Sequence, residues 1–272
     1  MKQAFLKKIY QAHQQPKAFP GSKEVELFLT DLLQFLFPEL NTIRFASPLE
    51  VETRFNQLKL DFEKLLIKTE ACQRNSVMSV CQCFFSGLDE IYEKCLEDSR
   101  AILEGDPAAI DEKEVIRTYP GFFAIAIYRI AHLACSLDVP YLPRIFTEFA
   151  HGKTGIDIHP SATIGRRFCI DHGTGIVIGA TTKIGDDVKI YQGVTLGALS
   201  VDKSMARQKR HPTIENNVVI YSGATILGGE TIIGHNSIIG GNVWITRSVA
   251  PFAKIYYSAK GNQKILDTNL KK

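Results

Sequence analysis

Apolar residues in the first half of the chain recur at spacings of three and four. Over residues 22–37 they fall on one side of a helix, at Val25, Phe28, Leu29, Leu32, Leu33 and Leu36. The same spacing returns over 56–68 and 77–103, and a buried helix is expected after Pro120-Gly121. Such spacing is typical of amphipathic helices packed on a core. It predicts a helical domain over residues 1–152.

A further helix is expected to begin at Asp106. An aspartate followed by proline, as in Asp106-Pro107, suits a helix N-cap with proline in the first turn. The predicted helix runs from there through Ile116.

From about residue 153 the spacing changes to six. The recurring aliphatic residues are Ile158, Ile164, Ile170, Ile178, Ile184, Ile190, Leu196, Ile214, Ile220, Ile226, Ile233, Ile239 and Ile245. Neither a helix nor a flat strand has this period, but a coil of three short parallel strands per turn does. The prediction is an α+β chain with a parallel β-helix of about four turns over 153–258, then a tail over 259–272. Insertions are expected at Gly173–Val177 and Gly228–Ile232, with a long loop at Ala198–Pro212. Trp244 is expected in the core.

Composition narrows the possible partners. With 272 residues, 45% of them hydrophobic, the chain can bury a core. The net charge of +3 comes from 32 bases and 29 acids, which favours neither nucleic acid nor a membrane surface. The longest apolar run, Phe122–Tyr128, is too short to span a bilayer, and the first residues do not resemble a secretory signal. Six scattered cysteines without a CxxC pair favour a reduced, cytoplasmic protein.

The hexapeptide pattern resembles the left-handed parallel β-helix of the acyltransferase superfamily. Within it, three stretches are similar to the serine O-acetyltransferase family: Gly155–Pro160, Ile170–Gly175, and Gln192–Gly197 with Arg210-His211-Pro212 closing the loop. Asp106-Pro107-Ala108 ahead of the coil adds to the likeness, which covers roughly Ser99–Ile255.

The resemblance implies L-serine and acetyl-CoA as substrates and a homotrimer, which the helical half could pair into a hexamer. It places CoA near Gly197, Ser222 and Gly241. Any glycine in such a repeat can instead be required by the corner itself. Cysteine differs from serine only by sulfur for oxygen, so cysteine is expected to inhibit in competition with serine.

Acyl transfer to a hydroxyl needs a base, and an imidazole titrates near neutral pH. His172 lies in a polar Asp-His-Gly-Thr-Gly stretch, and Asp157 precedes it by about one turn of the coil. A carboxylate beside the imidazole would fix its tautomer. We therefore expect His172 and Asp157 to act as a catalytic dyad.

The charged ends of serine require partners of opposite charge. Arg210 and His211 could hold the carboxylate, and Asp106 and Asp171 could hold the ammonium. The resemblance implies the same roles. Purely structural roles are the alternative. Asp106 could simply cap a helix, Asp157 could simply brace the turn before Pro160, and the bases of the long loop could simply be solvated.

Other functions share parts of this pattern. An acetyltransferase acting on a sugar or another hydroxyl acceptor would keep the coil and the base without the residues for the zwitterion. A zinc carbonic anhydrase on the same coil needs three converging histidines, and beyond His172 and His211 no third has suitable spacing. A purely structural protein would not explain Asp157 with His172. No metal is expected.

The end of the chain departs from the family. In many members a terminal isoleucine inserts into O-acetylserine sulfhydrylase, whereas here the last residues are Lys271 and Lys272. Placing a lysine in an apolar pocket is costly. We expect no tight tail-mediated complex with that enzyme. A second departure is Tyr256–Gly261, in place of the usual Gly-Val-Pro-Ala stretch.

Overall fold

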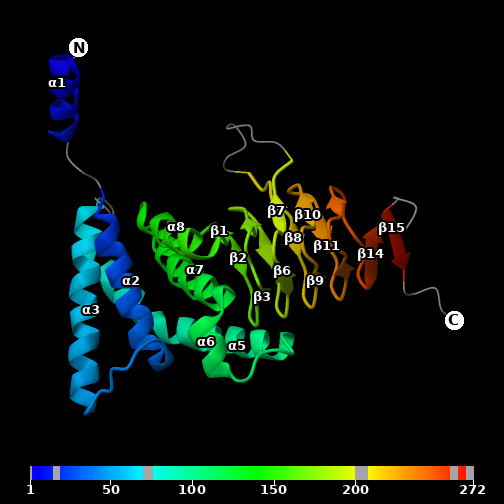
Figure 1. The fold of residues 1–272 in the computed structure, drawn as a ribbon, viewed down its shortest axis with the longest axis horizontal. Helices are drawn as coiled ribbons and strands as arrows, with labels where there is room; N and C mark the ends of the chain where they lie inside the picture. The colour runs from blue at the N-terminus through cyan, green and yellow to red at the C-terminus, as the bar shows by residue number, and fades with distance from the viewer. Residues whose placement is uncertain (1, 15–18, 70–75, 200–207, 258–262, 268–272) are drawn as a thin grey trace.

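The computed structural model describes residues 2–14, 19–69, 76–199, 208–257 and 263–267, and within them helices precede a coil of strands (Figure 1). The helices are α1 (Lys2–His13), α2 (Ser22–Leu36), the 3-10 helix η1 (Pro38–Leu40), α3 (Pro48–Lys68), α4 (Val77–Ser86), α5 (Leu88–Gly105), α6 (Glu112–Thr118), α7 (Pro120–Ser136) and α8 (Leu142–Thr154). The helical part thus extends to Thr154, just past the predicted boundary at residue 152.

The helix predicted to start at Asp106 is wrong. Asp106 is the C-cap of α5, and Asp111 caps α6 by accepting a hydrogen bond from the Glu114 backbone N–H. Asp106 Oδ1 instead accepts from the Ala108 N–H at 2.9 Å, within a turn. An aspartate two residues before an N–H readily forms such a turn, so the Asp-Pro pair ends one helix without starting another.

The strands are β1 (Asp157–Ile158), β2 (Thr163–Ile164), β3 (Cys169–Asp171), β4 (Val177–Ile178), β5 (Lys183–Ile184), β6 (Lys189–Tyr191), β7 (Thr195–Gly197), β8 (Thr213–Ile214), β9 (Val219–Ile220), β10 (Thr225–Leu227), β11 (Ile232–Ile233), β12 (Ile238–Ile239), β13 (Trp244–Ile245), β14 (Ala253–Tyr257) and β15 (Gln263–Asp267). They form three sheets: a five-stranded one (β1-β4-β7-β10-β13), a four-stranded one (β2-β5-β8-β11) and a six-stranded one (β3-β6-β9-β12-β14-β15). The predicted fold, helices followed by a parallel β-helix, is confirmed.

The six-residue period places one inward-facing aliphatic residue in each strand from β1 to β13. Ile178 pairs with Leu196 in a regular turn of eighteen residues, whereas Ile158 pairs with Ile178, so the corner after β3 holds two extra residues. Leu196 pairs with Ile226 across the long loop. All thirteen predicted aliphatic residues are buried. Their stacking fills the coil, and β14 extends the six-stranded sheet beyond the four turns predicted.

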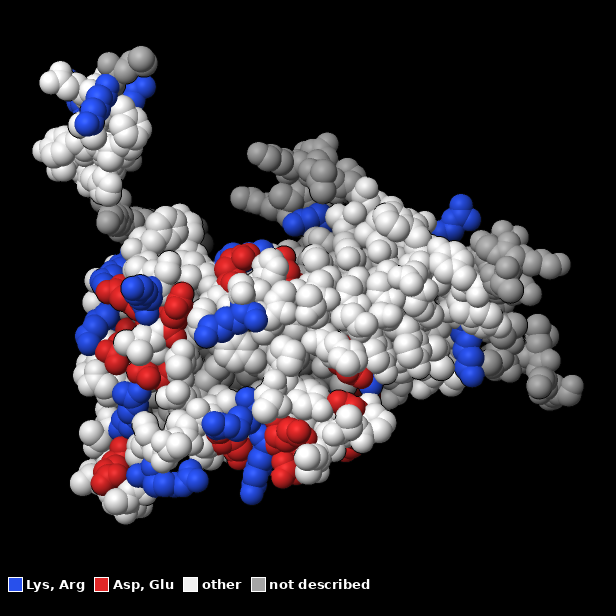
Figure 2. All heavy atoms as spheres, in the orientation of Figure 1, with Lys and Arg blue, Asp and Glu red and all other residues white. Residues whose placement is uncertain are grey.

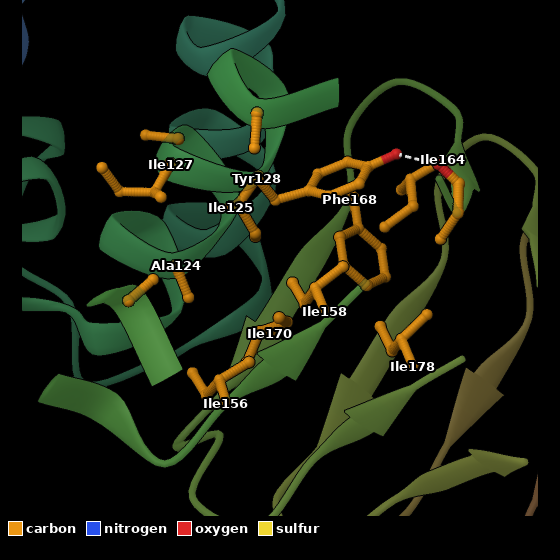
Figure 3. Close-up of a cluster of buried hydrophobic side chains, with 14 of the residues drawn as sticks. Ala124, Ile125, Ile127, Tyr128, Ile156, Ile158, Ile164, Phe168, Ile170 and Ile178 are labelled. Carbon is orange, nitrogen blue, oxygen red and sulfur yellow. Dashed lines mark hydrogen bonds between the residues drawn. The ribbon is translucent and has the colours of Figure 1, made fainter. Parts of the chain in front are cut away.

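Helix α7 packs directly on the first turn of the coil (Figure 3). The fully buried Tyr128 donates a hydrogen bond from its hydroxyl to the Ala162 carbonyl at 2.6 Å. Gly121 approaches so closely that a Cβ there would lie 2.4 Å from the Ile170 carbonyl oxygen. The helical and coil cores are therefore continuous, which fixes α5 and α7 against β3.

Trp244 and the C-terminal tail both differ from what the sequence predicts. Trp244 is not in the core: it points outward from the five-stranded sheet and is 59% exposed, because the alternation along β13 buries Ile245 instead. The predicted tail includes β15, which pairs antiparallel with β14.

The described cysteines are all free thiols. Within the described ranges, no helix combines the length and apolar character that crossing a bilayer requires.

Candidate active site

Most of the predicted site residues lie along two edges of the coil, one on each side of the five-stranded sheet. We call the corner between the six- and five-stranded sheets the histidine edge; it carries His172, Gln192, Ser222 and Gly241. The corner between the five- and four-stranded sheets is the arginine edge, with Gly179, Thr181, Arg210 and His211. Strand β4 alone lies between the corners of one turn, and residues 176–179 span about 10 Å of extended backbone.

His172 occupies the corner immediately after β3. Its φ is +59°, a left-handed conformation that histidine tolerates better than branched residues do. The next residue suits only glycine, because the φ of Gly173 is +98° and a Cβ there would also lie 2.5 Å from Ile156 Cδ1. The side chain of His172 is 72% exposed, and its Nε2 lies 3.6 Å from Asp171 Oδ1. The imidazole is therefore open to a ligand.

Asp171 contacts two groups through different oxygens. Its Oδ1 faces His172, and its Oδ2 pairs with Lys189 Nζ at 2.8 Å. Lys189 also donates to the Gly105 carbonyl at 2.6 Å and lies 4.5 Å from the centre of the Tyr191 ring. Partial burial alone would lower the pKa of Lys189, but hydrogen bonds to Asp171 and Tyr191 raise it above its usual range.

Asp106 lies close to this group, at the end of α5. Its Oδ2 accepts a hydrogen bond from the Tyr119 hydroxyl at 2.7 Å. That bond, with the one from the Ala108 N–H and the charges of Lys189 and His172, holds the pKa of Asp106 below its usual value. The same bond raises the pKa of Tyr119 to about 12, so Tyr119 stays a donor. The structure thus brings Asp106, Asp171 and His172 together.

Arg210 and His211 are held by Thr181 on the arginine edge. Thr181 Oγ1 accepts from the backbone N–H groups of both residues, at 3.0 and 3.1 Å. The Thr181 backbone N–H donates to His211 Nδ1 at 3.1 Å, so in a neutral ring the proton is on Nε2. Lys209 Nζ donates to the carbonyls of Thr181, His211 and Pro212 and secures the base of the loop.

His211 does not carry the positive charge expected of a partner for the serine carboxylate. Burial, together with the charges of Arg210 and Lys209, lowers the pKa of His211 to about 4. Its ring also packs against Gly179, where a Cβ would be 2.1 Å from Nε2. His211 is therefore neutral near pH 7 and can offer a carboxylate only an N–H, while Arg210 supplies the positive charge.

Asp157 is not bonded to His172 among the residues that the structure describes. On the outer side of β1, its Oδ1 accepts from Arg144 Nη1 of α8 at 3.0 Å. Asp157, Glu148 and His151 place possible metal-ligand atoms within 4.8 Å of one another. Arg144 pairs with both carboxylates, however, so the group already has its own cation.

The predicted CoA residues divide between the same two edges. Ser222 and Gly241 are in contact on the histidine edge: a Cβ on Gly241 would lie 3.0 Å from the Ser222 carbonyl oxygen. Gly197 ends β7 at the arginine edge. Between His172 and Ser222, Gln192 Oε1 is buried and has no hydrogen-bond partner among the described residues.

Several residues of these groups are absent from the sequence-based prediction. Lys189, Tyr119, Thr181 and Arg144 each contact a predicted residue distant in sequence or on another element. Of these four residues, only Lys189 carried a local sequence signal of a role in the site, as a basic residue on the outer side of a strand. A solvated surface lysine gives the same signal.

Helices followed by a coil of six-residue repeats, with polar groups along two edges, define the architectural class. No family model matches this chain. A plasmid-encoded serine acetyltransferase of Synechococcus elongatus is 50% identical over 186 residues, which cover 66% of this chain and 58% of that protein. This chain therefore matches less than two thirds of that relative's length.

Solved structures match over more of their length. Serine acetyltransferase isoform 3 of Entamoeba histolytica, in complex with cysteine, superposes with a TM-score of 0.77 at 35% identity, covering 90% of this chain and 85% of that one. A serine acetyltransferase in complex with CoA gives a TM-score of 0.60 at 25% identity, covering 90% and 98%. The chain belongs to the serine acetyltransferase family.

Proposed function

We propose that this chain transfers the acetyl group of acetyl-CoA to the hydroxyl of L-serine, giving the O-acetylserine used to make cysteine. The observation that carries the proposal is the exposed imidazole of His172 beside two carboxylates, Asp106 and Asp171. A base next to groups that can hold an ammonium suits an amino-acid alcohol. A sugar acceptor has no ammonium, so this arrangement favours serine over a sugar.

In the proposed reaction His172 removes the proton of the serine hydroxyl as its oxygen attacks the thioester carbonyl. The oxygen–carbon bond forms, the carbon–sulfur bond breaks, and the imidazolium returns the proton to the departing thiolate. Asp157 is proposed to orient the imidazole. The turn leading to Asp157 lies against the corner that follows His172, since a Cβ on Gly155 would lie 3.3 Å from Thr174 Cγ2. Asp157 would exchange Arg144 for His172 when substrate binds.

The carboxylate of serine is assigned to Arg210, with an N–H from His211. One chain holds these residues on the edge opposite His172, too far for one small substrate to touch both. We therefore propose a homotrimer in which the histidine edge of one copy faces the arginine edge of the next. Trp244 and Val177, 59% and 39% exposed on the five-stranded sheet, support such packing. On the face in Figure 2, charges gather over the helices, and the coil is largely uncharged.

Acetyl-CoA is proposed to lie along the histidine edge, with its thioester at His172. The buried Gln192 Oε1 suits an amide N–H of the pantetheine arm, and Ser222 with Gly241 leaves the corner low enough for close approach. Gly197 would contact the same molecule from the neighbouring copy. No metal is assigned a role: the cation beside Asp157 is Arg144.

Cysteine is proposed to act as a feedback inhibitor, because it presents the same ammonium and carboxylate. We further propose a cytoplasmic protein without nucleic-acid or membrane partners. The predicted failure to form a tail-mediated complex with O-acetylserine sulfhydrylase concerns Lys271 and Lys272, which lie outside the described residues.

The test is CoA release from acetyl-CoA with a panel of acceptors: L-serine, D-serine, L-homoserine and several sugars. We expect L-serine to be used at least tenfold more efficiently than any other acceptor, and L-cysteine to raise the KM for serine without changing kcat. Preferential use of a sugar would replace this function with the alternative acetyltransferase. Sedimentation of the same sample should give the mass of three chains or a multiple of it.

A further inference from the structure

Lys189 joins three parts of the site that are far apart in the sequence. From β6 its ammonium reaches the Asp171 carboxylate of β3 and the last carbonyl of α5, at Gly105. The side chains of Lys189 and Asp171 are only 16% and 12% exposed. This is a shielded contact, unlike the exposed pairs on the helices.

The position of the Lys189 ammonium has two consequences. Helix α5 has no basic residue in its last turn, so Lys189 supplies from another element the cation that favours a helix C-terminus. Asp106 directly follows Gly105, so the same bond fixes where Asp106 begins its turn. Lys189 thus sets the position of Asp106 relative to Asp171.

Lys189 also sets the charge facing His172. Among the described residues, the charged or titratable groups facing the imidazole are Asp171 of β3, Lys189 of β6 and Asp106 at the end of α5, with Tyr119 bonded to Asp106. The nearby Asp157 of β1 has its charge balanced by Arg144. Two carboxylates and one ammonium leave a single net negative charge. That charge matches one substrate ammonium.

We propose that Lys189 is a positioning residue for the acetyl-transfer site: it fixes Asp106 and Asp171 relative to each other and offsets one of the two carboxylate charges that face His172. The assignment rests on the proposed function for its substrate, but the electrostatic part concerns this chain alone. Asp171 bridges the two groups, with Lys189 on one oxygen and His172 on the other. Removing the ammonium would expose His172 to two uncompensated carboxylates, which stabilise an imidazolium.

The test compares Lys189→Met with Lys254→Met in the full-length protein. Both lysines occupy the same lateral position on the six-stranded sheet, because Lys189 pairs with Val219, Val219 with Ile238, and Ile238 with Lys254. Lys254 is exposed and far down the coil. We expect Lys189→Met to move the acid limb of the kcat/KM profile for serine up by about one pH unit. Lys254→Met should leave the profile unchanged.

A second readout does not depend on activity. The His172 ring signal, identified by its absence from His172→Asn, is titrated by NMR in the wild type and the variants. The midpoint should rise by about one pH unit in Lys189→Met, and Lys189→Arg, which keeps the charge, should restore it. Lys189→Gln replaces Lys189→Met if the latter does not fold.

An unchanged midpoint in Lys189→Met would overturn the proposal, whatever happened to stability. If the midpoint moved but the wild type did not acetylate serine, the proposed function would fail while the electrostatic role of Lys189 stood.

Discussion

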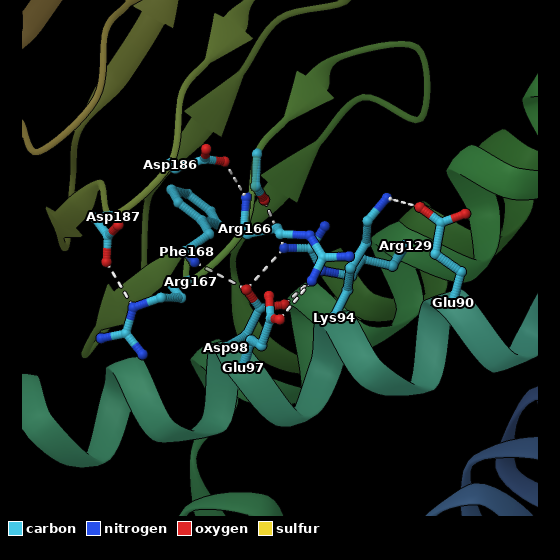
Figure 4. A network of polar contacts seen from close by, with 11 residues as sticks. Glu90, Lys94, Glu97, Asp98, Arg129, Arg166, Arg167, Phe168, Asp186 and Asp187 are labelled. Carbon is cyan, nitrogen blue, oxygen red and sulfur yellow. Dashed lines mark hydrogen bonds and ion pairs between the residues drawn. The ribbon is translucent and has the colours of Figure 1, made fainter.

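Asp98 of α5 and Arg129 of α7 form an ion pair whose side chains are 0% and 3% exposed (Figure 4). Both residues also bond the first turn of the coil: Asp98 Oδ1 accepts from the Phe168 N–H at 2.8 Å, and Arg129 Nη2 donates to the Gly165 carbonyl at 2.8 Å. Phe168 is three residues from Asp171. This buried pair therefore sets how the helices sit on the strand that leads into the active site.

Replacing Asp98 should destabilise the protein strongly. Asp98→Asn leaves Arg129 buried without its counter-charge, and breaking such a pair costs about 3–5 kcal/mol. Urea unfolding followed by circular dichroism measures the loss. The control is Asp61→Asn, which breaks an exposed pair with Lys64 and should cost less than about 1 kcal/mol. Equal effects of the two substitutions would show that the buried pair adds no special stability.

Replacing His172 should abolish the reaction without unfolding the coil. Asparagine is the appropriate substitute because it tolerates the φ of +59° at this corner, whereas alanine would add backbone strain. Loss of a general base typically lowers kcat by about 10²- to 10⁴-fold. His235→Asn, at a corner between the four- and six-stranded sheets, should keep full activity. Near-normal turnover in His172→Asn would exclude this histidine as the base.

Asp157 can be tested against its ion-pair partner. If Asp157 orients the base, Asp157→Asn should lower kcat at least tenfold while the KM for acetyl-CoA changes little, because the imidazole loses its orienting carboxylate. Arg144→Met removes the other half of the observed ion pair but leaves the carboxylate. We expect Arg144→Met to lose much less activity. Equal losses would mean that Asp157 serves only to hold α8.

Thr181 should control serine binding through the loop it holds. Thr181→Val removes the oxygen that accepts from the N–H groups of Arg210 and His211. The loop would then lose its fixed position. Because loss of one such hydrogen bond costs about 1–1.5 kcal/mol, the KM for serine should rise about tenfold. The KM for acetyl-CoA should change less than twofold. Thr181→Ser keeps the oxygen and should behave as wild type. A parallel rise in both KM values would instead indicate general damage to the edge.

The stability of the protein should fall on acidification partly because of His211. Its pKa is about 4 in the folded chain and near 6.5 when exposed, so the unfolded chain binds more protons between these values. The stabilisation is therefore complete above pH 6.5 and is lost as the pH falls toward 4. By pH 4.5 the loss amounts to about 2 kcal/mol. Denaturant unfolding at pH 7 and pH 4.5 should show a smaller loss for His211→Gln by that amount. An identical loss would mean that the histidine titrates normally in the folded state.

The fold was predictable because its signal is local and repeated. Each turn of the coil buries one aliphatic residue per strand, so Ile178, Leu196 and their equivalents mark the strands without any knowledge of their neighbours. The helix at Asp106 was mispredicted for the opposite reason. Asp-Pro fits both a helix start and a turn, and the choice depends on Tyr119 and Gly105, which local sequence does not place.

The candidate site was predictable only in part. Motif positions bring Asp106, Asp171 and His172 together, but the contact between Asp171 and Lys189 arises from pairing across a turn of the coil. The neutral state of His211 depends on its burial against Gly179. The separation of the two edges follows from the width of the five-stranded sheet, a property of the closed coil and not of any single motif.

The antiparallel pairing of β15 with β14 closes one end of the six-stranded sheet. A parallel coil that simply stopped would present a row of free backbone N–H and C=O groups, a template on which another chain could add end to end. At the opposite end, α5, α7 and α8 pack on the first strands and cover that edge. The final described strand thus occupies the position on which a further parallel strand would otherwise pair with β14. Loss of residues 258–272 would then favour concentration-dependent assembly of otherwise well-folded molecules.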